Sequence, residues 1–555
     1  MLDELDLTSL PDERTRTLVV GLLNLIENLS SDLRTAQAEI QRLRDETNRL
    51  KGEQGKPLIK PIAPRSSADH SSEQERHRPV ERVKRGKRDR IAIDRTQELP
   101  LDPDTLPADA EFKGYEEVVV QDLKLQTDNV CFRKAKWYAA STGQTYLAPL
   151  PLGYQGEFGP GVRALVLVFS FASQMTEPKI ADWFAHVGIS LSAGQISNLL
   201  IKGQSTFHHE KDAVYAAGLR SSPWQHLDDT ATRVNGHNQH CQVVTNPLHT
   251  TFITTEAKDR LTILDVLRNG AERTFRLNDE AFGYLEQAGV SALTREKLTR
   301  LPRDQNVDAA TFEKWLADAL PKLGAQPRKW ILDAAAVAAY HAQSEWPVVR
   351  LLVCDGAPQF TWVTEELSLC WVHEGRHYKK LQPVVPQHRA LLEQVLDELW
   401  AYYAELLVYR EQPSGAEGER LATAFDTLFS RQTGYEALDE RLELTLGKKA
   451  HLLLVLAHPE IPLHNNPAEL GARQRVRKRA ISFGPRTAEG AKAWDTFMSL
   501  AATTKQLGVN FYTYIHDRIS GGKQIPPLSQ IIDERAQDLN LGASWASSEA
   551  LPPVY

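Results

Sequence analysis

Three acidic residues of the chain stand where a sequence could support metal-dependent phosphoryl chemistry. Asp228 follows the apolar start of PWQHLDDTATRV, Asp355 ends the apolar run VVRLLVCD, and Glu469 lies where HNNPAELGARQRVRKR should begin a helix. Carboxylates from two strands and a helix can hold two Mg²⁺ ions about 3.5–4 Å apart, which together assist an in-line displacement at phosphorus. The spacing alone leaves this open, because a lone acidic residue after a strand is more often an ordinary turn residue.

Glu469 also fits a purely structural role. Asn466 as N-cap, Pro467 at the first helical position and Glu469 behind them would form a capping box. Capping does not explain the basic residues that follow, which are Arg473, Arg475, Arg477, Lys478 and Arg479. Arg473 and Arg477 stand at i+4 and i+8 from Glu469, so one helix face should carry a carboxylate and then guanidiniums, which suits a metal beside a phosphate backbone.

Neighbouring side chains compete for the same chemistry. Asp228 and Asp229 are adjacent in an expected strand and point to opposite faces, so only one of them can be a ligand. A possible zinc set consists of Cys354, Cys370, His373 and His377. Because Cys354 points away from Asp355 along its strand, shared coordination is awkward.

The elements that must position these residues alternate between strands and helices. PWQHLDDTATRV, CQVVTN and TTFITT predict a β meander, and the run before Asp355 predicts a strand buried on both faces. Residues 115–150 predict short strands, beginning with EEVVVQDLKLQ. Residues 176–201 predict two short helices joined by VGISLS, which fit either a helix-turn-helix or an ordinary helical pair. Residues 385–456 are helical in pattern.

The N-terminal segment carries a heptad seam and a basic linker. The seam consists of Val19, Leu22, Ile26, Leu29, Leu33, Ala36, Ile40, Leu43 and Leu50. It favours a self-associating coiled coil over a helix packed on its own protein. The polar linker from about Lys51 to Glu111 contains a basic run at 76–90, RHRPVERVKRGKRDR, that either contacts phosphates or is solvated.

The composition limits the classes of protein to which the chain can belong. The 555 residues suggest three or four domains, and 42% hydrophobic with 25% charged residues fit a chain with a sizeable core. The net charge of −7 requires any nucleic-acid surface to be local. Four scattered cysteines and an acidic start without an apolar signal core indicate a reducing cytoplasm. No apolar run approaches the roughly 20 residues of a membrane span.

Several motifs in order resemble the DDE transposases of the insertion sequence 66 family. They are LDDT (227–230), VCDGAPQF (353–360), CWVH (370–373) with RHYKK, NNPAE (465–469), and the tail FGPRTAEG through YTYI (483–515). The N-terminal seam fits as well. The resemblance covers most of the chain and is thinnest from 51 to 130.

The resemblance implies an α/β, RNase H-like catalytic core in which Asp228, Asp355 and Glu469 bind Mg²⁺ or Mn²⁺. It selects Asp228 over Asp229, because the family places its carboxylate first in the triplet. It implies that His373 lies near the active site, touching a phosphate or a flipped nucleotide. The family's cysteine-rich zinc module is reduced to Cys131, so no structural zinc is expected, and Leu470 replaces the arginine that usually follows the glutamate.

The expected organisation follows from these features. It comprises a coiled coil (1–50), a disordered basic linker (51–112), a small β module (113–155), a helical DNA-binding module (156–208), a catalytic domain (209–515) with a helical insertion about 380–460, and a tail (516–555). The expected function is metal-dependent DNA strand cleavage and transfer of an insertion sequence. A decayed dimeric DNA-binding protein and a nuclease on the same fold are the alternatives.

The expected partners are DNA, a second copy of the chain and accessory proteins of the same element, without a membrane. We expect the protein in the bacterial cytoplasm, associated with the nucleoid. The residues expected to contact nucleic acid are His373, Arg473, Arg477, Lys478, Arg479, Lys84, Arg85, Lys87 and Arg88.

Overall fold

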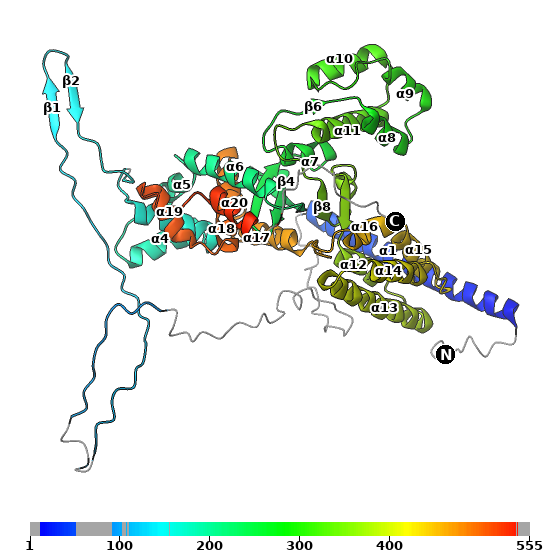
Figure 1. Ribbon diagram of the computed structural model, residues 1–555, viewed down its shortest axis with the longest axis horizontal. Helices are drawn as coiled ribbons and strands as arrows, with labels where there is room; N and C mark the ends of the chain where they lie inside the picture. The colour runs from blue at the N-terminus through cyan, green and yellow to red at the C-terminus, as the bar shows by residue number, and fades with distance from the viewer. Residues whose placement is uncertain are drawn as a thin grey trace.

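The protein is built around one mixed five-stranded sheet with helices on both faces (Figure 1). The computed structural model describes residues 12–51, 91–102, 107, 110–154, 156–539 and 541. The sheet strands are β3 (Trp224–Val234), β4 (His237–Asn246), β5 (His249–Thr255), β8 (Leu351–Cys354) and β9 (Glu366–Leu369). Their order is β5-β4-β3-β8-β9. The first three form an antiparallel meander, while β8 is parallel to β3 and β9 is parallel to β8.

Local sequence explains the meander and the central strand. Asn235 and Gly236 connect β3 to β4 with positive φ angles of 49° and 79°, the conformation of the two-residue turns that match strand twist. All four residues of β8 are buried, as an apolar strand between two helical layers requires. The three stretches of the predicted meander and the apolar run before Asp355 are therefore strands of one sheet.

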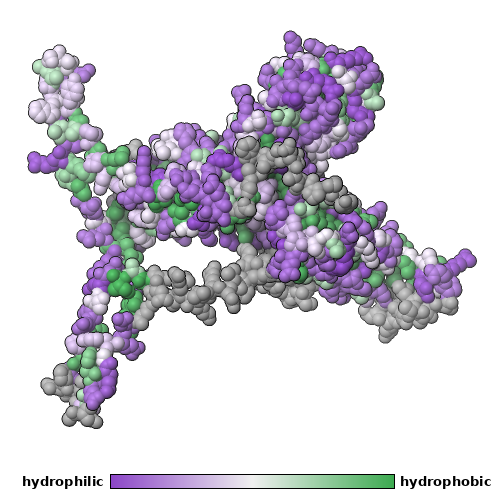
Figure 2. Space-filling view, in the orientation of Figure 1, coloured by the Kyte–Doolittle hydropathy of each residue, from purple (hydrophilic) through white to green (hydrophobic). Residues whose placement is uncertain are grey.

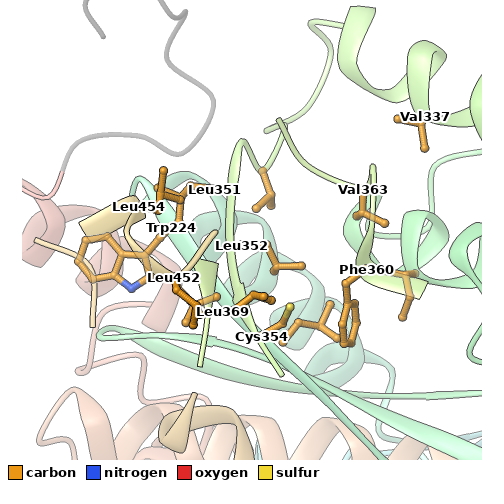
Figure 3. Close-up of a cluster of buried hydrophobic side chains, with 14 of the residues drawn as sticks. Trp224, Val337, Leu351, Leu352, Cys354, Phe360, Val363, Leu369, Leu452 and Leu454 are labelled. Atoms are coloured by element: carbon orange, nitrogen blue, oxygen red, sulfur yellow. The ribbon is translucent and has the colours of Figure 1, made fainter. Parts of the chain in front are cut away.

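Each sheet face contributes to a separate apolar core. Leu227, Val244 and β8 pack with α7 (Arg260–Leu267) and α11 (Ala325–Ala342). Figure 3 shows Leu352, Cys354, Phe360 and Val363 in this layer. On the opposite face, Val243 and Phe252 pack with α17 (Asn466–Ser482) and α18 (Ala488–Gln506).

Two insertions extend the sheet unit. Between β5 and β8 lie α7, β6 (Thr274–Phe275), α8 (Asp279–Gln287), α9 (Ala292–Leu298), β7 (Val307–Asp308), α10 (Ala309–Ala319) and α11. The strand β8 is followed by a 3₁₀ turn, η6 (Pro358–Phe360), and then β9. Between β9 and α17 lie α12 (Trp371–Lys379), α13 (Pro386–Glu411), α14 (Gly415–Phe429), α15 (Glu436–Leu446), α16 (Lys449–Leu452) and η7 (Leu454–Leu456). The first insertion was not predicted, since short helices around a two-stranded ribbon leave little periodic signal.

The helices that precede the sheet share a core with those that end the chain. They are α3 (Pro160–Leu167), the π-helical turn η5 (Val168–Ala172), α4 (Glu177–His186), α5 (Ala193–Ile201) and α6 (Ser205–Arg220). Ile180 and Ile196 belong to the same apolar cluster as Tyr514 of α19 (Phe511–Ser520) and Ile532 of α20 (Leu528–Asp538). Chain segments far apart in sequence therefore form one helical body beside the sheet (Figure 1).

An extended arm precedes that helical body. Residues 110–135 form neither helix nor strand, and the arm then makes one hairpin, β1 (Lys136–Ala139) with β2 (Gln144–Leu147). The prediction of a strand at EEVVVQDLKLQ is wrong, because no strand in the described part of the chain pairs with it. Val118 and Val120 are 76% and 80% exposed, and Figure 2 shows apolar and polar residues mixed along the arm.

The first helix, α1 (Glu13–Leu50), lies against the second insertion. The buried carboxylate of Glu27 accepts hydrogen bonds from the N–H groups of Val384 and Val385, at the start of α13. Asn24 donates to the carbonyl of Gly434 at 3.0 Å. The basic run at 76–90 lies outside the described residues. Among the helices that the structure describes, none has both the length and the apolar character needed to cross a bilayer.

Candidate active site

Asp228 and Asp355 lie side by side at the ends of neighbouring parallel strands. The last paired residues of β3 and β8 are His226 and Val353, and each aspartate stands two positions further on. Because side chains alternate along a strand, both carboxylates point to the same face. The strand ends therefore bring together two residues that are far apart in sequence.

The loop after Asp355 is held in place from both sides. The Oδ1 atom of Asp355 accepts a hydrogen bond from the N–H of Ala357 at 3.0 Å. Arg260 of α7 donates to the carbonyls of Thr361 at 2.6 Å and Pro358 at 3.1 Å, while its guanidinium also pairs with buried Asp333. The sequence carries no local signal for Arg260, because its three partners lie 73, 98 and 101 residues away.

Asn465 attaches the start of α17 to the end of β3. Its side-chain amide donates to the carbonyl of Leu227 at 2.8 Å, and its Oδ1 lies 3.1 Å from Nδ1 of His226. Burial lowers the pKa of His226 to about 3, so the ring is neutral and donates to Asn465. The backbone N–H of Asn465 in turn donates to Cys370 Sγ at 3.2 Å. These contacts fix α17 directly beside Asp228.

Glu469 points from α17 toward α12. The carboxylate is 8% exposed, and its Oε2 atom accepts a hydrogen bond from Arg376 at 3.1 Å. Arg473 lies 3.6 Å from the same oxygen. His373 accepts a hydrogen bond from Arg376 at Nε2, so its proton is on Nδ1, 3.5 Å from Glu469 Oε1. Oε1 itself is buried and has no hydrogen-bond partner among the described residues.

The capping-box interpretation of Glu469 is wrong. The carbonyl of Asn465 accepts the first helical hydrogen bond, from the N–H of Glu469, so Asn465 is the N-cap and Glu469 the fourth helical residue. A capping box pairs the N-cap with the third residue, which is Ala468 and has no acceptor. The side chain of Asn465 is also engaged with β3 instead of the helix end.

Crowding of carboxylates is visible in the electrostatics of Asp228. Burial raises its pKa to about 7, and the negative charges of Asp355, Glu469 and Asp229 add to the shift. A hydrogen bond from the N–H of Asp229 offsets part of this effect. Two of the acidic residues predicted from the sequence, Asp355 and Glu469, therefore act on the third, Asp228.

Asp229 points away from this cluster, as strand alternation predicts. Its carboxylate pairs with Lys258 at 3.2 Å and accepts a hydrogen bond from Gln359 at 3.3 Å. His240 lies 3.8 Å from the same group. Asp229 thus forms a local ion pair on the opposite side of β3.

One group of possible metal ligands in the described part of the chain overlaps with this site. Ligand atoms of Cys370, His373 and Glu469 all lie within 4.8 Å of one another. Burial raises the pKa of the Cys370 thiol to about 11, and the sulfur already accepts the N–H of Asn465. The protonated thiol therefore serves as a packing and hydrogen-bonding group. Cys354 and His377 are not members of this group.

The basic residues of α17 divide into two faces. Arg473 and Arg477 are exposed, and the Arg479 guanidinium, half-buried, donates to the carbonyl of Ala231. Lys478 is only 2% exposed, and its ammonium donates to the carbonyl and hydroxyl of Ser170 at 2.6 and 3.0 Å. Burial lowers the pKa of Lys478 to about 8. The expected contact between Lys478 and nucleic acid is therefore corrected, because its ammonium is used inside the protein.

Fold and site together define a mixed α/β protein in which Asp228 and Asp355 follow the paired ends of two parallel strands, and Glu469 lies on the helix that Asn465 attaches to β3. Asp228 and Asp355 do not belong to the group of possible metal ligands that contains Glu469. Residues 338–493 match the family described as Transposase IS66 family. An uncharacterized protein of Sinorhizobium fredii, y4jO, is 34% identical over 330 residues, which cover 58% of this chain and 99% of the relative. The chain belongs to the IS66 family of transposases. DNA is the partner that this family implies.

Proposed function

We propose that the protein is a DDE transposase that cleaves and joins DNA strands at the ends of its element. The observation that carries this proposal is the convergence of Asp228, Asp355 and Glu469 on one side of the sheet. The strand order β5-β4-β3-β8-β9, with only β4 running against the others, supports an RNase H-like core. In such a sheet the central strand and its parallel neighbour carry the first two acidic residues.

The three carboxylates fit a hard divalent cation. Burial and then the neighbouring negative charges raise the pKa of Asp228, and among the described residues nothing donates a hydrogen bond to buried Glu469 Oε1. Asp228, Asp355 and Glu469 would hold Mg²⁺ or Mn²⁺ through oxygen atoms, the ligands that these ions prefer. The bound ions would activate the attacking hydroxyl and stabilise the leaving oxygen.

Basic side chains around the carboxylates would position the DNA backbone. Arg376 holds Glu469 in its rotamer through the 3.1 Å hydrogen bond, and His373 lies beside it. Arg473 and Arg477 continue from Glu469 along the exposed face of α17, where guanidiniums can bind phosphate oxygens. Water or a DNA 3′-hydroxyl then attacks a phosphate held in line, and the leaving oxygen takes up a proton.

We further propose that α1 joins two copies as a coiled coil. Leu29 and Leu33 of the heptad seam are each 60% exposed, although the same helix contacts α13 through another face. Two paired copies would bring two element ends together. Accessory proteins of the same element remain an additional proposed partner.

A cleavage assay with matched variants tests the proposal. The substrate is duplex DNA from the ends of the element, with Mg²⁺ for cleavage and Ca²⁺ for binding alone. Glu469→Gln, Asp228→Asn and Asp355→Asn should each abolish nicking while binding in Ca²⁺ persists, because a neutral amide is a poor ligand for a hard dication.

Two control variants separate this outcome from general damage. Asp229→Asn should retain most of the activity, since its carboxylate pairs with Lys258 away from the cluster. Glu489→Gln changes an exposed carboxylate on α18 and should nick at the parental rate. If Glu469→Gln also nicks at that rate, the assignment of the three ligands fails.

A further inference from the structure

Phe483 is an exposed aromatic residue in an unusual backbone conformation. It follows the last residue of α17, its φ angle is +60°, and 90% of its surface is exposed. The left-handed region is costly for a residue with a bulky side chain, and such strain tends to occur where function requires it. Neither property is needed to end a helix, because Gly484 stands next in the chain and could take this position.

The backbone around Phe483 is held rigidly. The N–H of Phe483 donates to the carbonyl of Arg479 at 2.8 Å, and the N–H of Asn235 donates to the carbonyl of Pro485 at 3.1 Å. A Cβ atom on Gly484 would lie 2.9 Å from the carbonyl oxygen of Arg233, so only glycine permits this approach. The β3–β4 turn and the Phe483 turn therefore form one platform that presents the ring to solvent.

The segments that form this platform carry exposed arginines. Arg233 on β3 and Arg486 after Phe483 are both exposed, and Arg477 lies on the last turns of α17. An apolar ring among guanidiniums is poorly suited to an apolar protein partner. It is well suited to DNA, in which stacked bases lie between lines of phosphates.

The same helix connects Phe483 to the active site. Fourteen residues separate it from Glu469, and at 1.5 Å per residue this corresponds to about 21 Å. A duplex rises about 3.4 Å per base pair, so the span equals about six base pairs. Arg473 and Arg477 lie along the exposed face between the two ends.

We propose that Phe483 is a base-stacking residue that inserts at one step of the element's end, about six base pairs from the cleaved phosphate. This inference rests on the proposed function. Apolar side chains that enter a base step unstack it partially and bend the duplex. Insertion at a fixed distance from the carboxylates would set which phosphate reaches them, while Arg477 and Arg486 bind the flanking backbone.

Fluorescence of 2-aminopurine tests the stacking contact directly. Duplexes of the element's end carry the probe at successive positions, and the full-length protein is added in Ca²⁺ so that no cleavage occurs. Parental protein should change the signal at one or two adjacent positions about six base pairs from the cleavage site. Phe483→Ala should lose this change and weaken binding about tenfold, whereas Phe483→Trp should retain both.

Control measurements make the result decisive. Leu293→Ala removes an exposed apolar side chain from α9 and should leave the fluorescence profile unchanged. The inference is overturned if Phe483→Ala gives the same fluorescence profile as the parental protein. It is also overturned if Phe483→Ala changes the oligomeric mass of the protein without changing the DNA signal. If parental protein gives the local signal but never cleaves in Mg²⁺, the proposed function fails while the stacking contact stands.

Discussion

At the scale of single residues, the site combines buried charge with incomplete pairing. The negative charges of Asp355, Glu469 and Asp229 act on Asp228, while Arg376 and Arg473 pair with Glu469. A protein pays for such an arrangement in stability unless a cation binds. The charged form of the cluster therefore destabilises the ligand-free fold.

Stability of the metal-free protein should decrease as pH rises. The pKa of Asp228 is about 7 when folded and about 3.9 in an unfolded chain, so the folded state holds a proton that the unfolded state has lost. This contribution is complete below pH 4 and is lost as pH rises through 7. The melting temperature in EDTA should therefore fall between pH 5 and 8, less steeply in Asp228→Asn.

Mg²⁺ at pH 8 should raise the melting temperature of parental protein and not that of Asp228→Asn. Asp229→Asn is the matched control and should keep the parental pH dependence. If the melting temperatures of the parental protein and of Asp228→Asn fall equally across this pH range, the raised pKa assigned to Asp228 is wrong.

Some of these residues were predictable and others were not. The placement of Asp228 and Asp355 at the ends of strands is predictable, because each follows an apolar strand, a local signal. Arg376, Asn465 and Arg260 were missed, because their roles depend on which distant segments meet them. The first helical residue of α17 was misplaced by one position, and this error created the capping alternative for Glu469.

At the scale of elements, α17 performs two tasks with one set of basic residues. Arg475 and Lys478, three positions apart, face inward, where Arg475 pairs with Asp495 at 3.1 Å. Arg473 and Arg477, four positions apart, face outward. The helical period separates residues that the sequence presents as one basic run.

Substitutions on the two faces of α17 should have opposite effects. Lys478→Met keeps the aliphatic bulk but leaves the buried Ser170 carbonyl without its donor, which should cost about 1–3 kcal/mol of folding free energy. Arg477→Ala should leave the melting temperature unchanged and weaken DNA binding. Its slope of log affinity against log salt should fall by about 0.9. Equal effects of both variants on stability would refute this division.

The basic run at 76–90 can be tested in the same way. If it contacts phosphates, replacing Lys84, Arg85, Lys87 and Arg88 by alanine should weaken binding to every DNA sequence alike. The salt slope should fall by up to about 0.9 per lost contact. An unchanged slope, measured beside Arg477→Ala, would identify the run as a solvated linker.

Element prediction succeeded where periodicity was strong. The meander, the buried strand β8 and the helices of the second insertion follow from patterns of period 2 and 3.6. The segment EEVVVQDLKLQ alternates like a strand, but none of the strands that the structure describes pairs with it. Pairing is a property of the whole sheet, so alternation alone could not decide it.

At the scale of the whole molecule, α1 contacts its own chain through one face and leaves another free. Leu23 and Glu27 are buried, and Glu27 bonds to the start of α13 in the second insertion, whereas Leu29 and Leu33 are exposed. At about 100° per residue, the two pairs are centred about 120° apart around the helix. Intramolecular packing therefore leaves the heptad seam exposed. The helix α1 can pack on its own chain and pair with a second copy at the same time.

Charges placed in this seam should separate the copies without unfolding them. Leu29→Lys with Leu33→Lys introduces like charges into a paired seam, where they would face each other and cannot be solvated. Multi-angle light scattering should report the mass of one chain for this variant and a multiple of it for the parental protein. The melting temperature should change little, because neither leucine packs against the insertion.

A charge-matched control decides whether the loss of self-association depends on the position of the new charges or only on the added net charge. Asp32→Asn with Thr35→Lys adds the same net charge on an exposed side of α1 that lies outside the seam, so it should keep the parental mass. If strand joining requires two paired ends, the seam variant should also nick single ends in Mg²⁺ but fail to join them. A parental protein with the mass of one chain at micromolar concentration would refute the coiled coil, and α1 would then serve only to brace the second insertion.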